Sequence, residues 1–325
     1  MKSRNRALCS VIGFAASLLA TAAAAQDVYP SRAIRIVVPF AAGGPSDVLA
    51  RTLGARLQQA WGQPVVIDNR VGASGIIGAD FVAKSAPDGY TLLLAQVGDT
   101  ISVSLFPKMP YSFERDFAPI TLLGETAFVL VTHPSVPATN LGELIALAKA
   151  KPGQLTFGSS GAGAASHLAG ELLKSMAQID MLHVPYKGQA PATTDLLSDR
   201  ISLMFNNPIT STGHIKANRW RALAVSTATR TKGLPDVPTV AESGLPGFEV
   251  GFWLGALAPA GTPRPIIDKL NAEMVRVVRM PDVAEQLGAL GVEPIGSRPE
   301  EFARTIHSEV ERWAKVVKGA GVKPD

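Results

Sequence analysis

The chain has 325 residues, of which 46% are hydrophobic and 18% charged, one cysteine and a formal charge of +4. This length and apolar content suffice for two domains of ordinary size, each with its own core. Three positive charges, Lys2, Arg4 and Arg6, precede an apolar run and three alanines that end at Ala25. This pattern predicts an export signal cleaved after Ala25. The mature chain then has a formal charge of +1, which gives no support for nucleic-acid binding.

The composition of the mature chain also argues against most catalytic chemistry. It has no cysteine, because Cys9 lies inside the signal, so disulfides, thiolate metal sites and cysteine nucleophiles are excluded. None of the five histidines is paired at metal-ligand spacing. The sequence contains no phosphate-loop motif, no complete dinucleotide fingerprint and no complete nucleophile elbow. We therefore expect a protein that holds no metal or cofactor and is not an enzyme.

The first hundred residues of the mature chain alternate short apolar runs with amphipathic helical patterns. Strands are predicted at Ile34–Val38, Val65–Asp68 and Thr91–Ala95, and helices at Ser46–Ala60 and Gly75–Ser85. Such alternation is typical of βαβ units and predicts a parallel sheet.

The same alternation resumes after a boundary near residues 118–132. Asn140 and Glu143 form the sequence of a capping box and begin a helix. The other predicted helices here are 164–176, 190–197 and 208–217, and the predicted strands are Pro119–Leu123, Phe128–Val131, Leu155–Gly158, Met181–Val184, Ile201–Phe205 and Arg221–Val225.

A segment rich in proline and glycine follows residue 226, and three helices end the chain. These helices are predicted at 264–278, 282–290 and 299–318, and no strand is predicted among them. We expect them to pack back on the first domain. That gives a discontinuous first domain, 26–127 plus 226–325, with a second domain, 128–225, inserted into it. Two crossings between domains form a hinge beside a ligand cleft.

Two glycine-rich loops each follow a strand and begin a helix. The first contains Gly43 and Gly44, and the second spans residues 158–163. Backbone N–H groups at a helix N-terminus attract anions, so the pair predicts a site for a carboxylate held from two sides. Asp47, in the first turn after Gly44, either caps its helix or orients a water or ligand.

Polar residues also follow two strands of the second domain, at the strand ends where open αβ sheets bind ligands. Lys187 either holds a second anionic group or is a solvated loop lysine. Asn206 and Asn207 either hydrogen-bond the ligand or serve the turn before Pro208.

Six segments, spread in order over nearly the whole mature chain, carry a family resemblance. They are Val38-Pro39-Phe40-Ala41-Ala42-Gly43-Gly44-Pro45-Ser46-Asp47, Val66-Ile67-Asp68-Asn69-Arg70, Pro87-Asp88-Gly89-Tyr90-Thr91-Leu92-Leu93, Val184-Pro185-Tyr186-Lys187-Gly188, Arg221-Ala222-Leu223-Ala224-Val225 and Leu234-Pro235-Asp236-Val237-Pro238-Thr239-Val240. In these segments the chain closely resembles the periplasmic substrate-binding receptors of the tripartite tricarboxylate transporter family, often called Bug-type receptors.

The resemblance implies an α/β protein of the type II periplasmic binding fold, with two αβ domains around a ligand cleft and two crossover hinge segments. It implies a monomeric receptor in the periplasm that carries a small carboxylate (a di- or tricarboxylate, an acidic amino acid or an aromatic acid) to the membrane subunits of the transporter. The ligand-binding residues expected from the loops and the resemblance are Phe40, Ala41, Ala42, Gly43, Gly44, Asp47, Ser159, Ser160, Gly161, Ala162, Lys187 and Asn206.

Three positions depart from the family pattern and leave the far end of the ligand open. They are Gln189, where glycine is common, Asn206, where aspartate is common, and Asp99, where a neutral residue or histidine is usual. Two alternative functions remain at this stage. One is a ligand sensor for a membrane signalling system, and the other is a periplasmic hydrolase that uses Ser159 or Ser160 with His167.

Overall fold

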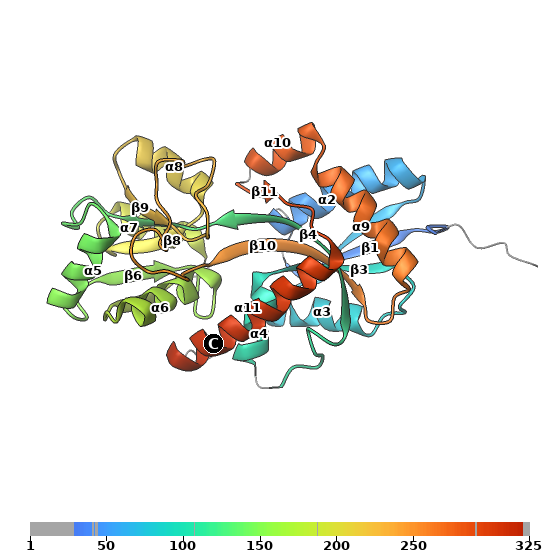
Figure 1. The fold of residues 1–325 in the computed structure, drawn as a ribbon, viewed down its shortest axis with the longest axis horizontal. Coiled ribbons are helices and arrows are strands. Elements are labelled where there is room, and N and C mark those ends of the chain that lie inside the picture. Colours follow the sequence, from blue (N-terminus) through green and yellow to red (C-terminus); the bar gives the residue numbers. More distant parts are fainter. Residues whose placement is uncertain are drawn as a thin grey trace, which may run out of the picture.

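The protein consists of two lobes joined by a pair of long strands (Figure 1). The computed structural model describes residues 29–40, 42, 45–106, 108–186, 188–289 and 291–320. The predicted export signal therefore lies outside the described residues, as do Ala41, Gly43, Gly44 and Lys187. In the described part of the chain, no helix is both long and apolar enough to cross a membrane.

The first lobe is built on a six-stranded sheet with the strand order β11-β4-β10-β3-β1-β2. β1 is parallel to β2 and β3, whereas β10 lies antiparallel between β3 and β4. The three strands of the predicted βαβ units, β1, β2 and β3, are parallel as expected, and the antiparallel strands β10 and β11 make the whole sheet mixed. The strands are β1 (Ile34–Val38), β2 (Val65–Asn69), β3 (Thr91–Gln96), β4 (Phe117–Ala127), β10 (Gly251–Pro259) and β11 (Glu293–Pro294).

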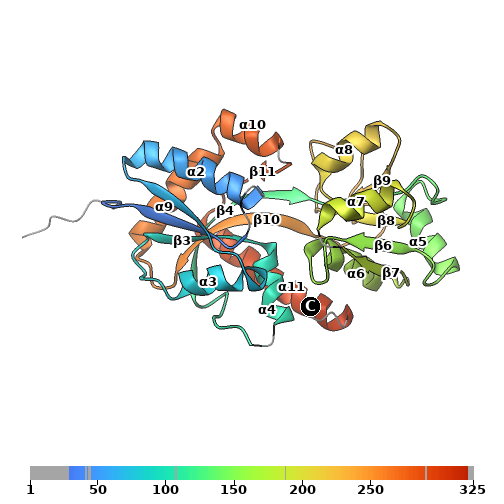
Figure 2. The same ribbon diagram turned by 180° about the vertical axis from the view of Figure 1, so that it is seen from behind.

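Helices cover both faces of this sheet (Figure 2). The apolar face of α2 consists of leucines at helical spacing, Leu49, Leu53 and Leu57, which are buried in one core cluster with Leu270 of α9. This burial explains why the amphipathic pattern folds as a helix on the sheet. The helical elements are α2 (Pro45–Trp61), a 3-10 turn (Ala73–Gly75), α3 (Ile76–Ala83), α4 (Val97–Leu105), α9 (Arg264–Val278), α10 (Pro281–Ala289) and α11 (Pro299–Ala320).

The second lobe is built on a five-stranded sheet with the order β7-β6-β8-β5-β9. β6 is parallel to β7 and β8, and β5 is antiparallel to β8 and β9. Its elements are β5 (Val129–Thr132), α5 (Leu141–Ala150), β6 (Thr156–Ser159), α6 (Ala165–Ala177), β7 (Leu182–Pro185), α7 (Gln189–Leu197), β8 (Leu203–Asn206), α8 (Pro208–Lys216) and β9 (Arg221–Val225).

The capping box predicted for α5 is only half formed. Asn140 Oδ1 accepts a hydrogen bond from Glu143 N at 2.9 Å, as expected of an N-cap. The Glu143 carboxylate accepts from Thr139 N at 2.7 Å rather than from Asn140 N. The carboxylate of Glu143 thus bonds the residue before the N-cap instead of the N-cap itself.

Three elements of the fold, α4, β10 and β11, were not predicted from the sequence. β10 is a central strand of the first sheet, so the expectation that the C-terminal part contributes only helices was wrong. Its sequence, Gly-Phe-Trp-Leu-Gly-Ala-Leu-Ala-Pro, has no alternation of polar and apolar residues, because it is buried on both faces.

The two crossings between the lobes run from β4 into β5 and from β9 towards β10. Residues 237–250, expected in the first domain, lie against the second sheet instead. Val225 forms a bridge with Thr239, and Val250 N donates to Ser226 O at 2.8 Å. Phe248 stacks on Phe205 with ring centroids 5.9 Å apart. We therefore propose that the chain returns to the first domain at Gly251.

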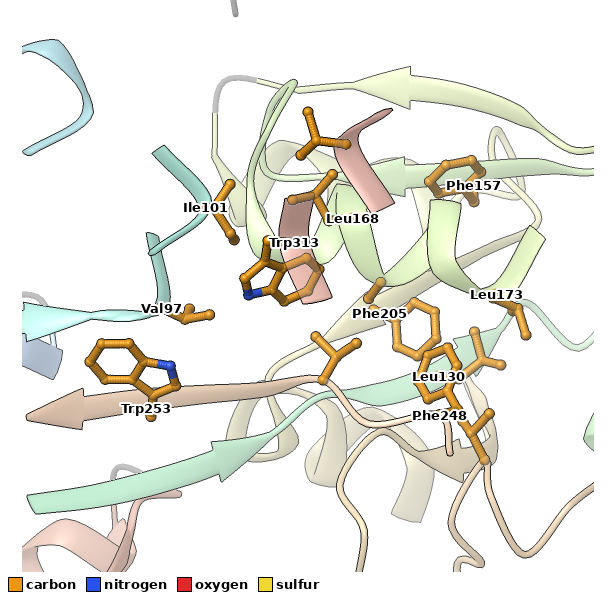
Figure 3. Close-up of a cluster of buried hydrophobic side chains, with 14 of the residues drawn as sticks. Val97, Ile101, Leu130, Phe157, Leu168, Leu173, Phe205, Phe248, Trp253 and Trp313 are labelled. Carbon is orange, nitrogen blue, oxygen red and sulfur yellow. The ribbon is translucent and has the colours of Figure 1, made fainter. Parts of the chain in front are cut away.

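Helix α11 ties the two lobes together, because it packs against α4 and β4 of the first lobe and α6 of the second. Trp313, on α11, is fully buried. Its indole lies near Ile101 of α4 and Leu168 of α6, as Figure 3 shows. A single core cluster therefore continues from one lobe into the other through this helix.

Replacing Gly170 in α6 with alanine is expected to lower the free energy of unfolding by about 1–3 kcal/mol. A Cβ atom at Gly170 would lie 2.2 Å from the Phe157 ring, which is itself fully buried and cannot move aside freely. Chemical denaturation measures the change. Gly213→Ala in α8 is the matched control, since a Cβ there meets nothing within 4 Å. An equal loss in both variants would contradict this account.

Candidate functional site

A cavity of about 560 Å³ opens between the two lobes. None of the side chains in its described wall is charged. The wall consists of Phe40, Ser74, Gln96, Val97, Gly98, Ile101, Ser102, Leu105, Phe106, Thr126, Phe128, Ser160, Gly161, Ala162, Gly163, Ala164, Ala165, Ser166, Gln189, Asn207, Phe252 and Val292.

Four helices direct their N-termini at this cavity. Gln96 and Gly98 bring the start of α4 from the first lobe, while Ala164, Gln189 and Asn207 bring the starts of α6, α7 and α8 from the second. Each N-terminus carries about half a positive charge and unpaired N–H groups. A wall with several such ends and no described charged side chain gives a positive potential suited to an anion.

The second glycine-rich loop contributes Ser160, Gly161 and Ala162 to the cavity wall. Gly161 has a φ of 144° and Gly163 a φ of 75°, values that L side chains rarely adopt. Ser166, in the first turn of α6, accepts from Ser160 N at 3.1 Å. The loop is therefore held in one shape by its own helix.

Ser159 lies behind this loop and not in the cavity wall. It is fully buried, and its hydroxyl donates to Gly161 O at 3.0 Å. The same oxygen accepts from Gly161 N at 3.2 Å and lies 2.7 Å from His183 Nε2. With its only hydrogen used, Ser159 has no donor left for a ligand and acts as a positioning residue.

Two stacked imidazoles support the loop from below. The rings of His167 and His183 are 3.7 Å apart and nearly parallel, and His167 Nδ1 accepts from Gly163 N at 3.0 Å. Burial lowers the pKa of His183 to about 4, so His183 is neutral at pH 7. The serine–histidine pair considered for a hydrolase is therefore not formed with His167, and the serine that does bond a histidine is enclosed.

The first loop is described only in part. Phe40 lies in the cavity wall, whereas Ala42 is exposed and outside it. Asp47 is 3% exposed, and its carboxylate accepts from Arg51 Nε at 2.9 Å and Asn69 Nδ2 at 3.0 Å. These bonds favour the structural role of Asp47 over a direct ligand contact.

Two positions that depart from the family pattern contact each other. Asn206 is fully buried outside the cavity wall, and its Oδ1 accepts from Gln189 Nε2 at 2.6 Å. Gln189 itself lies in the wall, next to the second loop, because Gly188 N donates to Ser160 O at 3.1 Å. Asn207, rather than Asn206, brings this strand end to the cavity.

Helix α4 contributes to the cavity wall, which was not predicted from the sequence. Gln96, Val97, Gly98, Ile101 and Ser102 all line the cavity. α4 begins directly at the end of β3 without a polar linker, so its residues read as a continuation of the strand. The one available signal was Gln96 followed by Asp99, which form a capping box.

Asp99 is buried beneath this helix start. Its Oδ2 accepts from Gln96 N at 2.8 Å, and its Oδ1 has no hydrogen-bond partner among the described residues. Burial raises the pKa of Asp99 to about 7, against an ordinary value of 3.8. The folded chain therefore retains a proton at Asp99 that the unfolded chain releases between about pH 4 and pH 7.

Asp99 should therefore make a contribution to stability that is lost as pH rises from about 4 to 7, and Asp99→Asn should remove this contribution. An asparagine oxygen still accepts from Gln96 N but needs no proton to be neutral. The free energy of unfolding of both proteins, measured by denaturation at several pH values from 4 to 8, tests this. Parallel pH profiles would show that Asp99 does not titrate as its burial requires.

The fold and the cavity define a class: a two-lobed solute-binding protein with an anion-attracting cleft between its lobes. A sequence profile described as tripartite tricarboxylate transporter family receptor matches residues 49–322. Protein BugT of Bordetella pertussis is 40% identical over 97% of this chain and 98% of its own. The chain therefore belongs to the tripartite tricarboxylate transporter family of receptors.

Solved structures share this fold. R. palustris Rpa4515 with adipate is 38% identical, with a TM-score of 0.76 over 91% of this chain and all of its own. MatC (Rpa3494) from Rhodopseudomonas palustris with bound malate is 35% identical, with a TM-score of 0.72 over 89% of this chain and all of its own. Adipate and malate are both small carboxylates.

Proposed function

We propose that this protein is a periplasmic solute-binding receptor that captures a small carboxylate between its two glycine-rich loops. It then delivers the ligand to the membrane subunits of a tripartite tricarboxylate transporter and carries out no chemistry itself. The observation that carries the proposal is the convergence of four helix N-termini on one cavity whose described wall has no charged side chain. Membership of the receptor family and the carboxylates bound by two relatives support it.

The wall also suggests how the cleft would respond to a ligand. Ser160 and Gln96 come from opposite lobes, so a carboxylate that bonds both residues draws the lobes together. The long strands β4 and β10, paired from Gly251–Ala127 to Pro259–Phe117, cross between the lobes and would bend as the hinge.

The test is ligand binding by the mature protein, residues 26–325, refolded from denaturant so that no co-purified ligand remains. Ligand at 100 times its dissociation constant should raise stability by about 2.7 kcal/mol. Thermal shift identifies the carboxylate, and small-angle scattering should report a smaller radius of gyration with it. If no mono-, di- or tricarboxylate, acidic amino acid or aromatic acid causes either change, the proposal fails.

A ligand sensor would bind and close in the same way. Delivery is tested separately, by uptake of the identified carboxylate in cells that lack this protein and in cells complemented with it. Uptake that does not depend on the protein would favour the sensor.

A further inference from the structure

Two acceptors behind the cavity wall set the orientation of the Gln189 side-chain amide. Its Nε2 donates to Phe205 O at 3.2 Å and to Asn206 Oδ1 at 2.6 Å, so both amide hydrogens are used. No described group is bonded to its Oε1. The polar atom that Gln189 has left for the cavity is therefore a hydrogen-bond acceptor.

Backbone groups fix this orientation. Phe205 O is a carbonyl and can only accept, so the Gln189 atom beside it must be the nitrogen. Asn207 N donates to Asn206 Oδ1 at 2.9 Å, so the Asn206 atom shared with Gln189 must be the oxygen. Rotating either amide would place two acceptors or two donors face to face. Unlike a solvated glutamine, Gln189 cannot present its NH₂ group to a ligand without breaking two bonds.

An acceptor at this place discriminates between ligand substituents. It attracts a donor and repels a second carboxylate. An ammonium group would donate as well, but the surrounding helix N-termini make the cavity positive and oppose a cation. A hydroxyl group can donate a hydrogen bond to Gln189 without placing a positive charge in the cavity. Gly188 N donates a hydrogen bond to Ser160 O, so Gln189 lies beside the second glycine-rich loop, where the ligand carboxylate is proposed to bind. The hydroxyl group is therefore expected on a carbon close to that carboxylate.

The geometry points to a hydroxycarboxylate ligand, with Gln189 as the specificity-determining residue that accepts a hydrogen bond from its hydroxyl. This rests on the proposed carboxylate function and deepens it. Asn206 is a positioning residue in this account, since it is fully buried behind Gln189 and holds the amide in place.

The experiment uses four matched ligand sets that differ at carbon 2 by hydrogen, hydroxyl or ammonium. They are propanoate, lactate and alanine; succinate, malate and aspartate; adipate, 2-hydroxyadipate and 2-aminoadipate; and 3-phenylpropanoate, 3-phenyllactate and phenylalanine. Dissociation constants are measured by calorimetry. In the set that binds, the hydroxy acid should bind about tenfold more tightly than the unsubstituted acid.

Gln189→Met, of similar length but without a comparable acceptor, should bring that ratio close to one while the unsubstituted acid still binds. Gln154→Met is the matched control, because Gln154 is exposed and is not part of the cavity wall, and the ratio in this variant should stay unchanged. Gln189→Ala replaces the methionine variant if that one does not fold, as judged by its melting temperature.

The outcomes separate the two proposals. Binding of a carboxylate set without preference for the hydroxyl, a stronger preference for the ammonium, or a preference that survives Gln189→Met overturns the role of Gln189 and leaves the carboxylate receptor standing. If none of these sets binds but another carboxylate of the thermal-shift screen does, the hydroxycarboxylate ligand is overturned unless that acid carries a hydroxyl group and its affinity depends on Gln189. Failure of every carboxylate in the sets and in the screen overturns the carboxylate receptor and the hydroxycarboxylate ligand with it.

Discussion

Ala162→Asp is expected to weaken carboxylate binding at least a hundredfold while the protein stays folded. Ala162 lies in the cavity wall, in the glycine-rich loop just before α6. A carboxylate at position 162 would repel the carboxylate of the ligand. Two unit charges about 5 Å apart repel by about 3 kcal/mol at an effective dielectric constant of about 20, which corresponds to about a hundredfold in affinity.

Stability should not fall, because an acidic residue near a helix N-terminus interacts favourably with the helix dipole. Calorimetry with the carboxylate identified by thermal shift measures the affinity, and a thermal melt without ligand measures the stability. Ala162→Asn is the matched control, of the same shape without the charge, and should retain most of the affinity. Undiminished binding by the aspartate variant would remove this loop from the ligand site.

Trp313→Ala is expected to lower the free energy of unfolding by about 3–5 kcal/mol. The side chain is fully buried in the core cluster that α11 shares with both lobes. Its indole nitrogen also donates to Glu309 Oε2 at 2.7 Å. The truncation therefore leaves a cavity and, in addition, removes a hydrogen bond from a buried carboxylate.

Urea denaturation measures this loss. Trp313→Phe is the matched variant, since it keeps most of the apolar volume but not the hydrogen bond, and should lose clearly less. A loss below about 1 kcal/mol for Trp313→Ala would mean that α11 does not join the lobes as a shared core. Ligand affinity should change little in the phenylalanine variant, because Trp313 is not in the cavity wall.

Much of the fold was predictable, because local sequence patterns indicate where many of its strands and helices begin and end. The strand Ile34–Val38 and the helix Arg264–Val278 were predicted at their observed bounds. Both have clear boundaries in the sequence: Pro39 ends the strand, and Pro263 precedes a helix with a strong apolar face. β10 carried no such signal, since a strand buried on both faces reads only as an apolar run that a helix could also contain.

The candidate site likewise has residues that local patterns predicted and residues whose position they did not predict. The loop residues Ser160, Gly161 and Ala162 were predicted from a strand, a glycine-rich turn and a helix in succession, and the structure brings them to the cavity wall. Whether they contact the ligand stays a prediction. Ser159 shows the limit of that reasoning, because neighbouring residues in a loop face opposite ways, and its burial depends on His183, which is 24 residues away.

The sequence by itself determined the class of the protein, the alternation of strands and helices, and the two glycine-rich loops. These features depend on contacts between residues near each other in the chain, or on motifs. Only the tertiary structure decided that α4 lines the cleft, that β10 completes the first sheet and that Gln189 uses its amide hydrogens on Phe205 and Asn206. Each of these depends on contacts between distant segments, such as β10 with β3 or Gln189 with Asn206, and no local pattern records them.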